Sequence, residues 1–146
     1  MRVILDTNVL LSAILAFARP ESAIDEIVDS AVRGTYALLT PEEVIDELVA
    51  ARSKKPSLIR AIPEGELYQF IRLLRTIAEI IPRQREPIPA VLRDPKDDFL
   101  LTAAAIGNAD YLVTGDRDLL DIRDQLTQPQ ILTVAEFLAL LQAIEQ

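Results

Sequence analysis

Carboxylates are the residues of this sequence whose type allows chemistry. The 146 residues include 23 Asp and Glu but no histidine and no cysteine. Catalysis by serine–histidine or cysteine–histidine pairs is therefore excluded, as are zinc sites built on thiolates or imidazoles. Acid–base or metal chemistry must come from Asp and Glu, with Lys and Tyr as weaker candidates.

Two aspartates directly follow apolar strands. Asp6 comes after a strand predicted over residues 3–5, and Asp116 comes shortly after one predicted over residues 111–113. Sites in open α/β sheets form beyond the C-terminal ends of the strands. We therefore expect both carboxylates over the same edge of one sheet.

Two more aspartates, Asp97 and Asp98, precede an apolar helix predicted over residues 99–106. This helix is apolar on nearly every side, which predicts that it is buried. It leads back to the strand before Asp116, and helix starts in such a sheet face the same edge as strand ends. The pair is therefore expected to join the cluster.

Glu47 lies one turn inside a helix that is predicted to run to about Ala51. On a helical wheel it borders the apolar arc, whereas Asp46 points well away from it. A carboxylate at the margin of a buried face can point into a cleft. Glu43, one turn earlier, is a weaker candidate on the same side.

A cluster of this kind favours bound cations. Four or more anions held together repel one another, and protonation or a cation must relieve that repulsion. Oxygen ligands without histidine favour Mg²⁺ or Mn²⁺ over zinc, and such ions can activate water and orient a phosphodiester. The formal charge of −8 opposes broad attraction to nucleic acid, but bound cations reverse the field locally.

The elements that must position these acids alternate between strand and helix. This order predicts an α/β fold with a mostly parallel central sheet of about five strands, covered on both faces. The length fits a single domain over residues 1–146. Strands are predicted over residues 3–5, 36–39, 78–81, 111–113 and 131–132. Helices are predicted over residues 9–17, 22–32, 41–51, 63–76, 99–106 and 133–144.

Two helix starts carry capping signals. Thr40 is followed by Pro41 and then by Glu43, and Thr133 is followed three residues later by Glu136. Both patterns are typical of a capping box, in which the threonine hydroxyl and the glutamate carboxylate satisfy backbone N–H groups at the helix start.

Four segments together point to one family. They are V-I-L-D-T-N-V from Val3, E-x-x-x-E-L from Glu43, R-D-P-K-D-D-x-L-L from Arg93 and A-D-Y-L-V-T-G-D-R-D-L-L from Ala109. In this order and at these separations they resemble the PIN domain, over almost the whole chain. The likeness is greatest to small prokaryotic PIN proteins described as toxins of toxin–antitoxin pairs.

This resemblance implies a three-layer α/β/α fold and a metal-dependent endoribonuclease that uses Mg²⁺ or Mn²⁺. The acids it implies at the site are Asp6, Glu47, Asp97, Asp98 and Asp116, and the auxiliary groups are Asn8, Thr114 and Asp118. Between the two neighbouring aspartates, the D-P-x-D pattern favours Asp97 as the ligand, while the spacing to apolar helix residues favours Asp98. An RNA substrate, an antitoxin protein and a second copy in a homodimer are the expected partners.

Structural roles compete with each assignment. Asp6 or Asp97 alone could be a helix N-cap, and Asp98 suits the positive end of a helix. Asp116 could be a turn aspartate, and Glu47 alone is more often a solvated surface residue. Taken together, however, these roles leave the convergence of the acids on one edge unexplained.

A basic stretch, Arg52, Lys54 and Lys55, is most simply a solvated turn, and a substrate contact is the weaker interpretation. Residues 52–62 and 82–97 are expected rims of a substrate groove. The apolar helices over residues 9–17 and 133–144 suit either a dimer surface or the core.

Two other function classes compete with a nuclease. A receiver-like signalling domain requires paired acids after the first strand and a lysine after a late strand, whereas Asp6 stands alone and no lysine follows Lys96. A catalytically silent PIN fold that only binds is the second alternative. No apolar run approaches the roughly 20 residues of a membrane span, and the start resembles no signal peptide, so a cytoplasmic location is expected.

Overall fold

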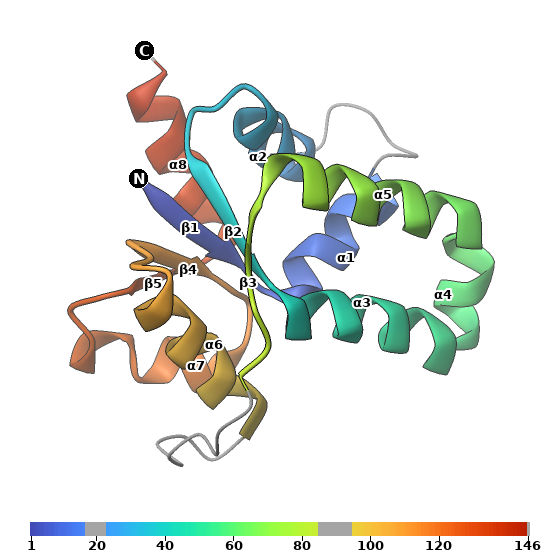
Figure 1. The fold of residues 1–146 in the computed structure, drawn as a ribbon. Coiled ribbons are helices and arrows are strands. Elements are labelled where there is room, and N and C mark those ends of the chain that lie inside the picture. The colour runs from blue at the N-terminus through green and yellow to red at the C-terminus, as the bar shows by residue number, and fades with distance from the viewer. Residues whose placement is uncertain (17–22, 85–94, 146) are drawn as a thin grey trace.

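A five-stranded parallel sheet forms the centre of the fold (Figure 1). The computed structural model describes residues 1–16, 23–84 and 95–145, without the side chains of residues 23, 24 and 95–98. The strands are β1 (Arg2–Leu5), β2 (Ala37–Pro41), β3 (Glu79–Ile81), β4 (Tyr111–Val113) and β5 (Gln130–Leu132). Their order is β3-β2-β1-β4-β5, and every pairing is parallel. The expected α/β class and strand number are confirmed.

Helices cover both faces of this sheet. They are α1 (Thr7–Ala16), α2 (Ala23–Val32), α3 (Glu42–Lys54), α4 (Pro56–Ala61), α5 (Glu64–Ile77), α6 (Pro95–Ile106), α7 (Arg117–Asp121) and α8 (Val134–Ile144), with a 3₁₀ turn, η1, over Arg123–Gln125. Figure 1 shows α6 and α7 on one side, and α1, α3 and α5 on the other. Helix α1 also contacts α2, which contacts α8. The result is the predicted three-layer α/β/α arrangement.

Several boundaries differ from those expected, and two differences matter for the site. Helix α1 begins at Thr7, immediately after Asp6, rather than at Val9. Helix α3 continues to Lys54, three residues beyond the expected end at Ala51. The physical break comes only at Lys55, because a residue before proline disfavours helical backbone. The short elements α4, α7 and η1 were not predicted.

The two expected capping boxes had opposite outcomes. At Thr133 the box is present, since its hydroxyl accepts from the Glu136 N–H and the Glu136 carboxylate accepts from the Thr133 N–H. At Thr40 the prediction is wrong, because Thr40 and Pro41 belong to strand β2. Pro41 occupies the N-cap position of α3, and the Thr40 hydroxyl is buried without a hydrogen-bond partner.

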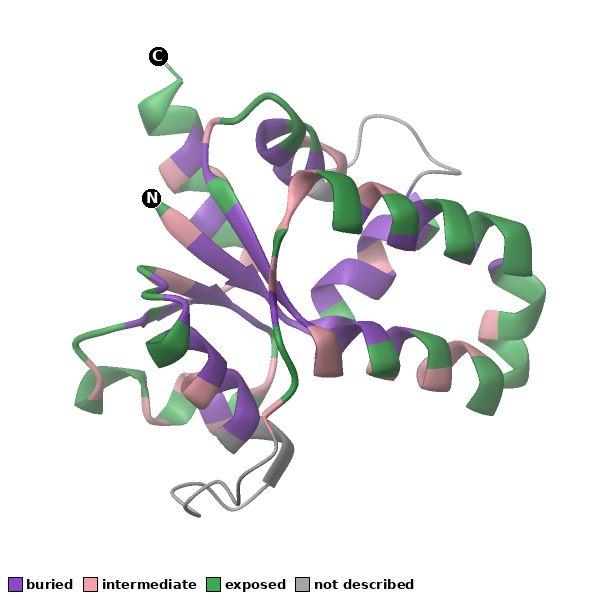
Figure 2. Cartoon of the chain, in the orientation of Figure 1, coloured by how far each residue is buried: buried purple, intermediate pink, exposed green. Residues whose placement is uncertain are grey.

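The buried side chains form one cluster on both sides of the sheet, which Figure 2 shows as purple strands and inward helix faces. Helix α1 contributes mainly to this core, although Leu15 is exposed. In α6, Phe99, Leu100 and two alanines are buried, but Ile106 is 51% exposed, so this helix is less enclosed than expected. Among the described residues, no helix has the length and apolarity needed to cross a membrane.

Candidate active site

Asp6 lies at the carboxyl end of the central strand β1. Its backbone N–H donates to the Val113 carbonyl (3.0 Å), which extends the pairing with β4. One carboxylate oxygen, Oδ1, accepts from the Thr7 N–H at 2.6 Å. The other, Oδ2, accepts from the Thr114 hydroxyl at 2.7 Å. The first residue of α1 and the residue that follows β4 therefore hold this carboxylate in a single orientation.

The environment of Asp6 disfavours its charged form. Its side chain is only 8% exposed. Burial raises the pKa of Asp6 above its ordinary value, the hydrogen bonds from Thr114 and Thr7 partly oppose this rise, and the nearby negative charge of Asp116 adds to it. A buried carboxylate under repulsion from a neighbour is an arrangement that a bound cation would stabilise.

Asp116 lies just beyond the adjacent strand, β4, as the sequence predicted. Its N–H donates to the hydroxyl of Thr114 (3.0 Å), the group that binds Asp6. Its carboxylate accepts from the Asp118 N–H (2.9 Å) and caps the short helix α7. Asp116 thus has the structural role considered above and also lies beside Asp6. Thr114 is fully buried and connects the two acids.

Glu47 reaches the same place from helix α3. Its carboxylate accepts a 2.7 Å hydrogen bond from the Thr7 hydroxyl. Thr7 is itself 6% exposed and follows Asp6 directly. Thr7 therefore binds Asp6 through its backbone N–H and Glu47 through its hydroxyl. The sequence did not predict this role, although Thr7 lies within the D-T-N segment of the first motif.

These acids line one cleft, with a volume of about 540 Å³. The end of β1 and the start of α1 contribute Asp6, Thr7 and Asn8, and the end of β4 contributes Asp116. Helix α3 and the residue after it contribute Asp46, Glu47, Ala50, Ala51, Lys54 and Lys55. Helix α6 contributes Phe99 and Leu100. Three of the predicted acids and the auxiliary Asn8 are thus brought together; Asp118 is half-buried and is not part of this lining.

Asp97 and Asp98 belong to the first turn of α6, which begins at Pro95. The alternative in which Asp97 caps this helix is therefore wrong, since Asp97 is the third helical residue. Their side chains lie outside the described residues. The next two residues, Phe99 and Leu100, line the cleft, so the start of α6 lies at the predicted edge.

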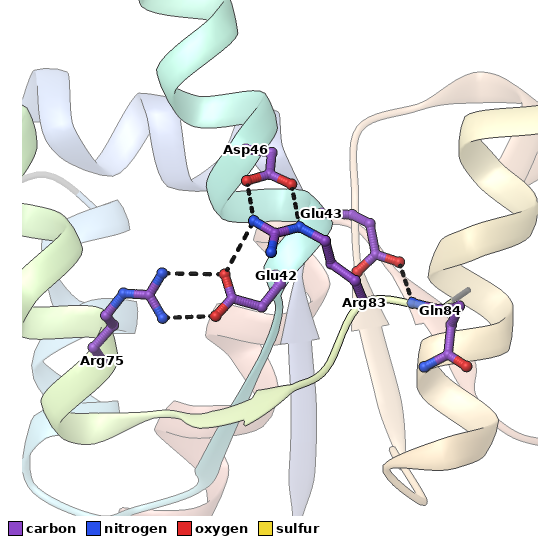
Figure 3. Close-up of polar contacts among 6 residues, drawn as sticks. All are labelled: Glu42, Glu43, Asp46, Arg75, Arg83 and Gln84. Carbon is purple, nitrogen blue, oxygen red and sulfur yellow. Dashed lines mark hydrogen bonds and ion pairs between the residues drawn. The ribbon is translucent and has the colours of Figure 1, made fainter.

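Asp46 is a correction to the helical-wheel argument. It was expected to point away from the site, but it also lines the cleft. Its two carboxylate oxygens accept from the Arg83 guanidinium at 2.8 and 2.6 Å, and Arg83 holds the pKa of Asp46 below its ordinary value. Asp46 and Glu47 are adjacent residues of α3, and both border the cleft. Figure 3 shows the bidentate pair.

Two further carboxylates of α3 have partners nearby, and only Glu42 is linked to Arg83 (Figure 3). Glu42 binds Arg75 of α5 through two hydrogen bonds and lies 3.7 Å from Arg83. Glu43 accepts from the Gln84 N–H at 3.3 Å, and its other oxygen is buried without a partner. The weaker candidate Glu43 therefore contacts the segment after β3 and does not line the cleft.

The donor chemistry of the cleft suits a hard divalent cation. Its acids offer oxygen atoms only, which Mg²⁺ and Mn²⁺ prefer. Among the described residues, no group of three carboxylates stands close enough to hold a metal ion. Asp6 and Asp116 are nevertheless near enough for one charge to raise the pKa of the other, and Asp97 and Asp98 belong to the first turn of the helix whose Phe99 and Leu100 line the same cleft.

Comparison with known families agrees with this geometry. A PIN domain family model matches residues 2–118, which include every predicted acid and both strand ends of the site. A comparison with curated proteins gave no match. PIN domains are generally metal-dependent nucleases and typically use Mg²⁺ or Mn²⁺. With the family model covering most of its length, this chain belongs to the PIN-domain family.

Proposed function

We propose that this protein is a metal-dependent endoribonuclease that hydrolyses phosphodiester bonds of RNA in the cleft between α3 and α6. The observation that carries this proposal is the placement of Asp6: a buried carboxylate beside Asp116, with Glu47 connected to it through Thr7. Burying a charge is costly unless a cation or a proton neutralises it, and the family to which the chain belongs uses such cations.

The cation would bind between Asp6 and Asp116, with Glu47 in the same cleft and with Asp97 or Asp98 from the first turn of α6 as a further ligand. The chemistry that bound Mg²⁺ or Mn²⁺ supplies is activation of water and stabilisation of charge on the phosphodiester. In the hydrolysis, a water oxygen bonds to phosphorus, the bond from phosphorus to the leaving oxygen breaks, and that oxygen takes up a proton.

The protein groups around the acids preorganise this chemistry. The Thr114 hydroxyl and the Thr7 N–H each occupy one oxygen of Asp6, which leaves the remaining lone pairs of both oxygens free to bind. The Thr7 hydroxyl orients Glu47. Phe99 and Leu100 supply an apolar wall that excludes water from one side.

Cleavage of labelled single-stranded RNAs, in Mg²⁺, in Mn²⁺ and in EDTA, tests the proposal. Wild type should cut only with a metal, and Asp6→Asn should abolish cutting. Asp124→Asn is the matched control, because it removes the same charge from an exposed residue of η1 away from the cleft. Cutting by Asp6→Asn at the wild-type rate would remove Asp6 from the site. A wild type that binds RNA but never cuts it would favour the silent binding module.

We also propose that the protein is the toxin of a toxin–antitoxin pair. The motifs it shares with small prokaryotic PIN proteins of that kind support this role. Expression of wild type should arrest bacterial growth, while Asp6→Asn should not. Equal growth with both proteins, at equal protein levels, would contradict the toxin role without touching the nuclease activity measured in vitro.

A further inference from the structure

The cleft has a basic end as well as an acidic one. Lys54 and Lys55 line the cleft that contains Asp6 and Asp116. Both lysines are exposed. The simplest interpretation of the sequence was that these lysines belong to a solvated turn. That interpretation does not explain why both lysines line the cleft.

The two ends are connected by one stripe along helix α3. Glu47, Ala51 and Lys54 are four and then three residues apart, the spacing that places side chains on one face of a helix. At 1.5 Å per residue, Lys54 lies about 10 Å along the axis from Glu47. The middle of the stripe consists of the small side chains of Ala50 and Ala51. The stripe therefore offers an acidic end, an open floor and a basic end.

No carboxylate of the described chain pairs with the ammonium groups of Lys54 and Lys55. Five arginines of the described chain form ion pairs, namely Arg2, Arg33, Arg75, Arg83 and Arg123. The described arginines that form none, Arg52, Arg60, Arg72 and Arg117, do not line the cleft. Within the described ranges, neither Lys54 nor Lys55 forms an ion pair or a side-chain hydrogen bond. Two uncompensated cations at the mouth of a cleft stand out in a chain with a formal charge of −8.

A structural role explains only part of this arrangement. Cations near the C-terminus of a helix interact favourably with its dipole, and Lys54 is in the last turn of α3. Lys55, however, follows the helix and precedes Pro56 of α4. The only other acid on the α3 wall outside the cluster, Asp46, is already paired with Arg83, so an anion on this wall meets little uncompensated negative charge.

We propose that Lys54 and Lys55 form a phosphate-binding subsite for the backbone of single-stranded RNA, one step along the strand from the phosphate that is cut. This inference rests on the proposed nuclease function and names how the cleft holds its substrate. Lysine ammonium groups bind phosphates as point charges and read no bases. The subsite therefore contributes affinity and register but no sequence preference.

Binding of a labelled single-stranded RNA of about twelve nucleotides, measured by fluorescence anisotropy in Ca²⁺ over a range of salt concentrations, tests the subsite. The variant is Lys54→Gln with Lys55→Gln. The control is Arg33→Gln with Arg72→Gln, which removes the same charge from exposed residues outside the cleft and outside both expected groove rims. The lysine pair should weaken binding of all sequences alike and reduce the slope of log K against log salt by about 1.4, since each single-strand phosphate contact contributes about 0.7. The control pair should leave the slope unchanged.

Cleavage kinetics provide a second measurement, which distinguishes a phosphate-binding role of the two lysines from a purely structural one. In Mg²⁺ the lysine variant should raise KM and leave kcat near the wild-type value, because no group at the acidic end has changed. Equal weakening by both variant pairs, or an unchanged salt slope in the lysine variant, would overturn the subsite. Tighter binding of duplex than of single-stranded RNA would overturn its single-strand character. Wild type that binds no RNA would instead contradict the proposed function itself.

Discussion

The hydroxyl of Thr7 donates a 2.7 Å hydrogen bond to Glu47, although forty positions separate the two residues along the chain. Thr7 is at the same time the first residue of α1, and its N–H binds Asp6. One residue thus fixes the carboxylates of a strand end and of a helix on the opposite wall. Groups that orient metal-binding carboxylates in this way commonly control affinity for the metal.

Replacing Thr7 with valine should therefore impair activity without unfolding the protein. Valine matches the shape of threonine but removes the hydroxyl that donates to Glu47, so that carboxylate loses one of the contacts that orient it. We expect a loss of about 10- to 100-fold in Mg²⁺ affinity or in kcat/KM, measured by metal titration of the cleavage rate. Thr7→Ser keeps the hydroxyl and should retain most activity. Equal loss in both variants would show that packing at Thr7, and not its hydrogen bond, is what matters.

Asp6 should make the metal-free protein less stable as the pH rises. Its pKa is raised in the fold, so the folded state binds more protons than the unfolded state from the ordinary value of 3.8 upward through the raised pKa. Stability contributed by this group therefore falls with increasing pH across that window. Asp6→Asn removes the effect, since an amide can accept from the Thr7 N–H and donate to the Thr114 hydroxyl.

The measurement is urea unfolding of both proteins in EDTA from pH 3.8, the ordinary pKa of an aspartate, up to pH 8. Asp6→Asn should gain stability relative to wild type as the pH rises, and Mg²⁺ should raise the Tm of wild type only. The comparison uses the difference between the two proteins, because Glu42 and Asp46, whose pKa values are lowered, act in the opposite sense in both. A difference that does not change with pH would contradict the raised pKa.

Arg83 should act on RNA binding by compensating the charge of Asp46. Without the guanidinium, Asp46 would leave an uncompensated negative charge on the cleft wall beside Glu47. Arg83→Gln is thus expected to weaken RNA binding most at low salt, where charges are least screened. Adding Asp46→Asn should restore it. Arg75→Gln, in the same network but paired with Glu42 outside the cleft lining, is the control and should bind like wild type.

The position of the site was predictable because parallel strands impose it. Asp6 and Asp116 follow neighbouring strands β1 and β4, so any chain with these strands must place both residues at one edge. The helical pattern around Glu47 was also sufficient to place this residue at the cleft. A residue at the margin of the apolar face of a helix lies at the border of the core, where a cleft can open. The order of the residues and the alternation of strands and helices were therefore enough to predict where most of the cleft's acids lie.

A substrate contact by the lysines was the weaker interpretation of the sequence for a local reason. Arg52 to Lys55 is polar and precedes Pro56, which suggests a turn, yet the helix continues to Lys54. Lys54 is seven residues after Glu47, so only the three extra helical residues place it on the same face as the acid. The pairing of Asp46 with Arg83 joins two segments far apart in sequence, and no short-range pattern specifies such a contact.

The two threonines with capping signals provide the last prediction, since the same local pattern has different outcomes. At Thr133 the hydroxyl binds the Glu136 N–H, and Thr133→Ala should cost about 1 kcal/mol of unfolding free energy. At Thr40 the residue continues β2 and its buried hydroxyl has no partner, so the strand environment overrides the capping pattern. Thr40→Val preserves the shape, suits a strand and removes an unsatisfied polar atom, so it should leave stability unchanged or increased. Urea unfolding of both variants measures the contrast. Destabilisation by Thr40→Val as large as that by Thr133→Ala would mean that the Thr40 hydroxyl is hydrogen-bonded in solution and that its capping role is real.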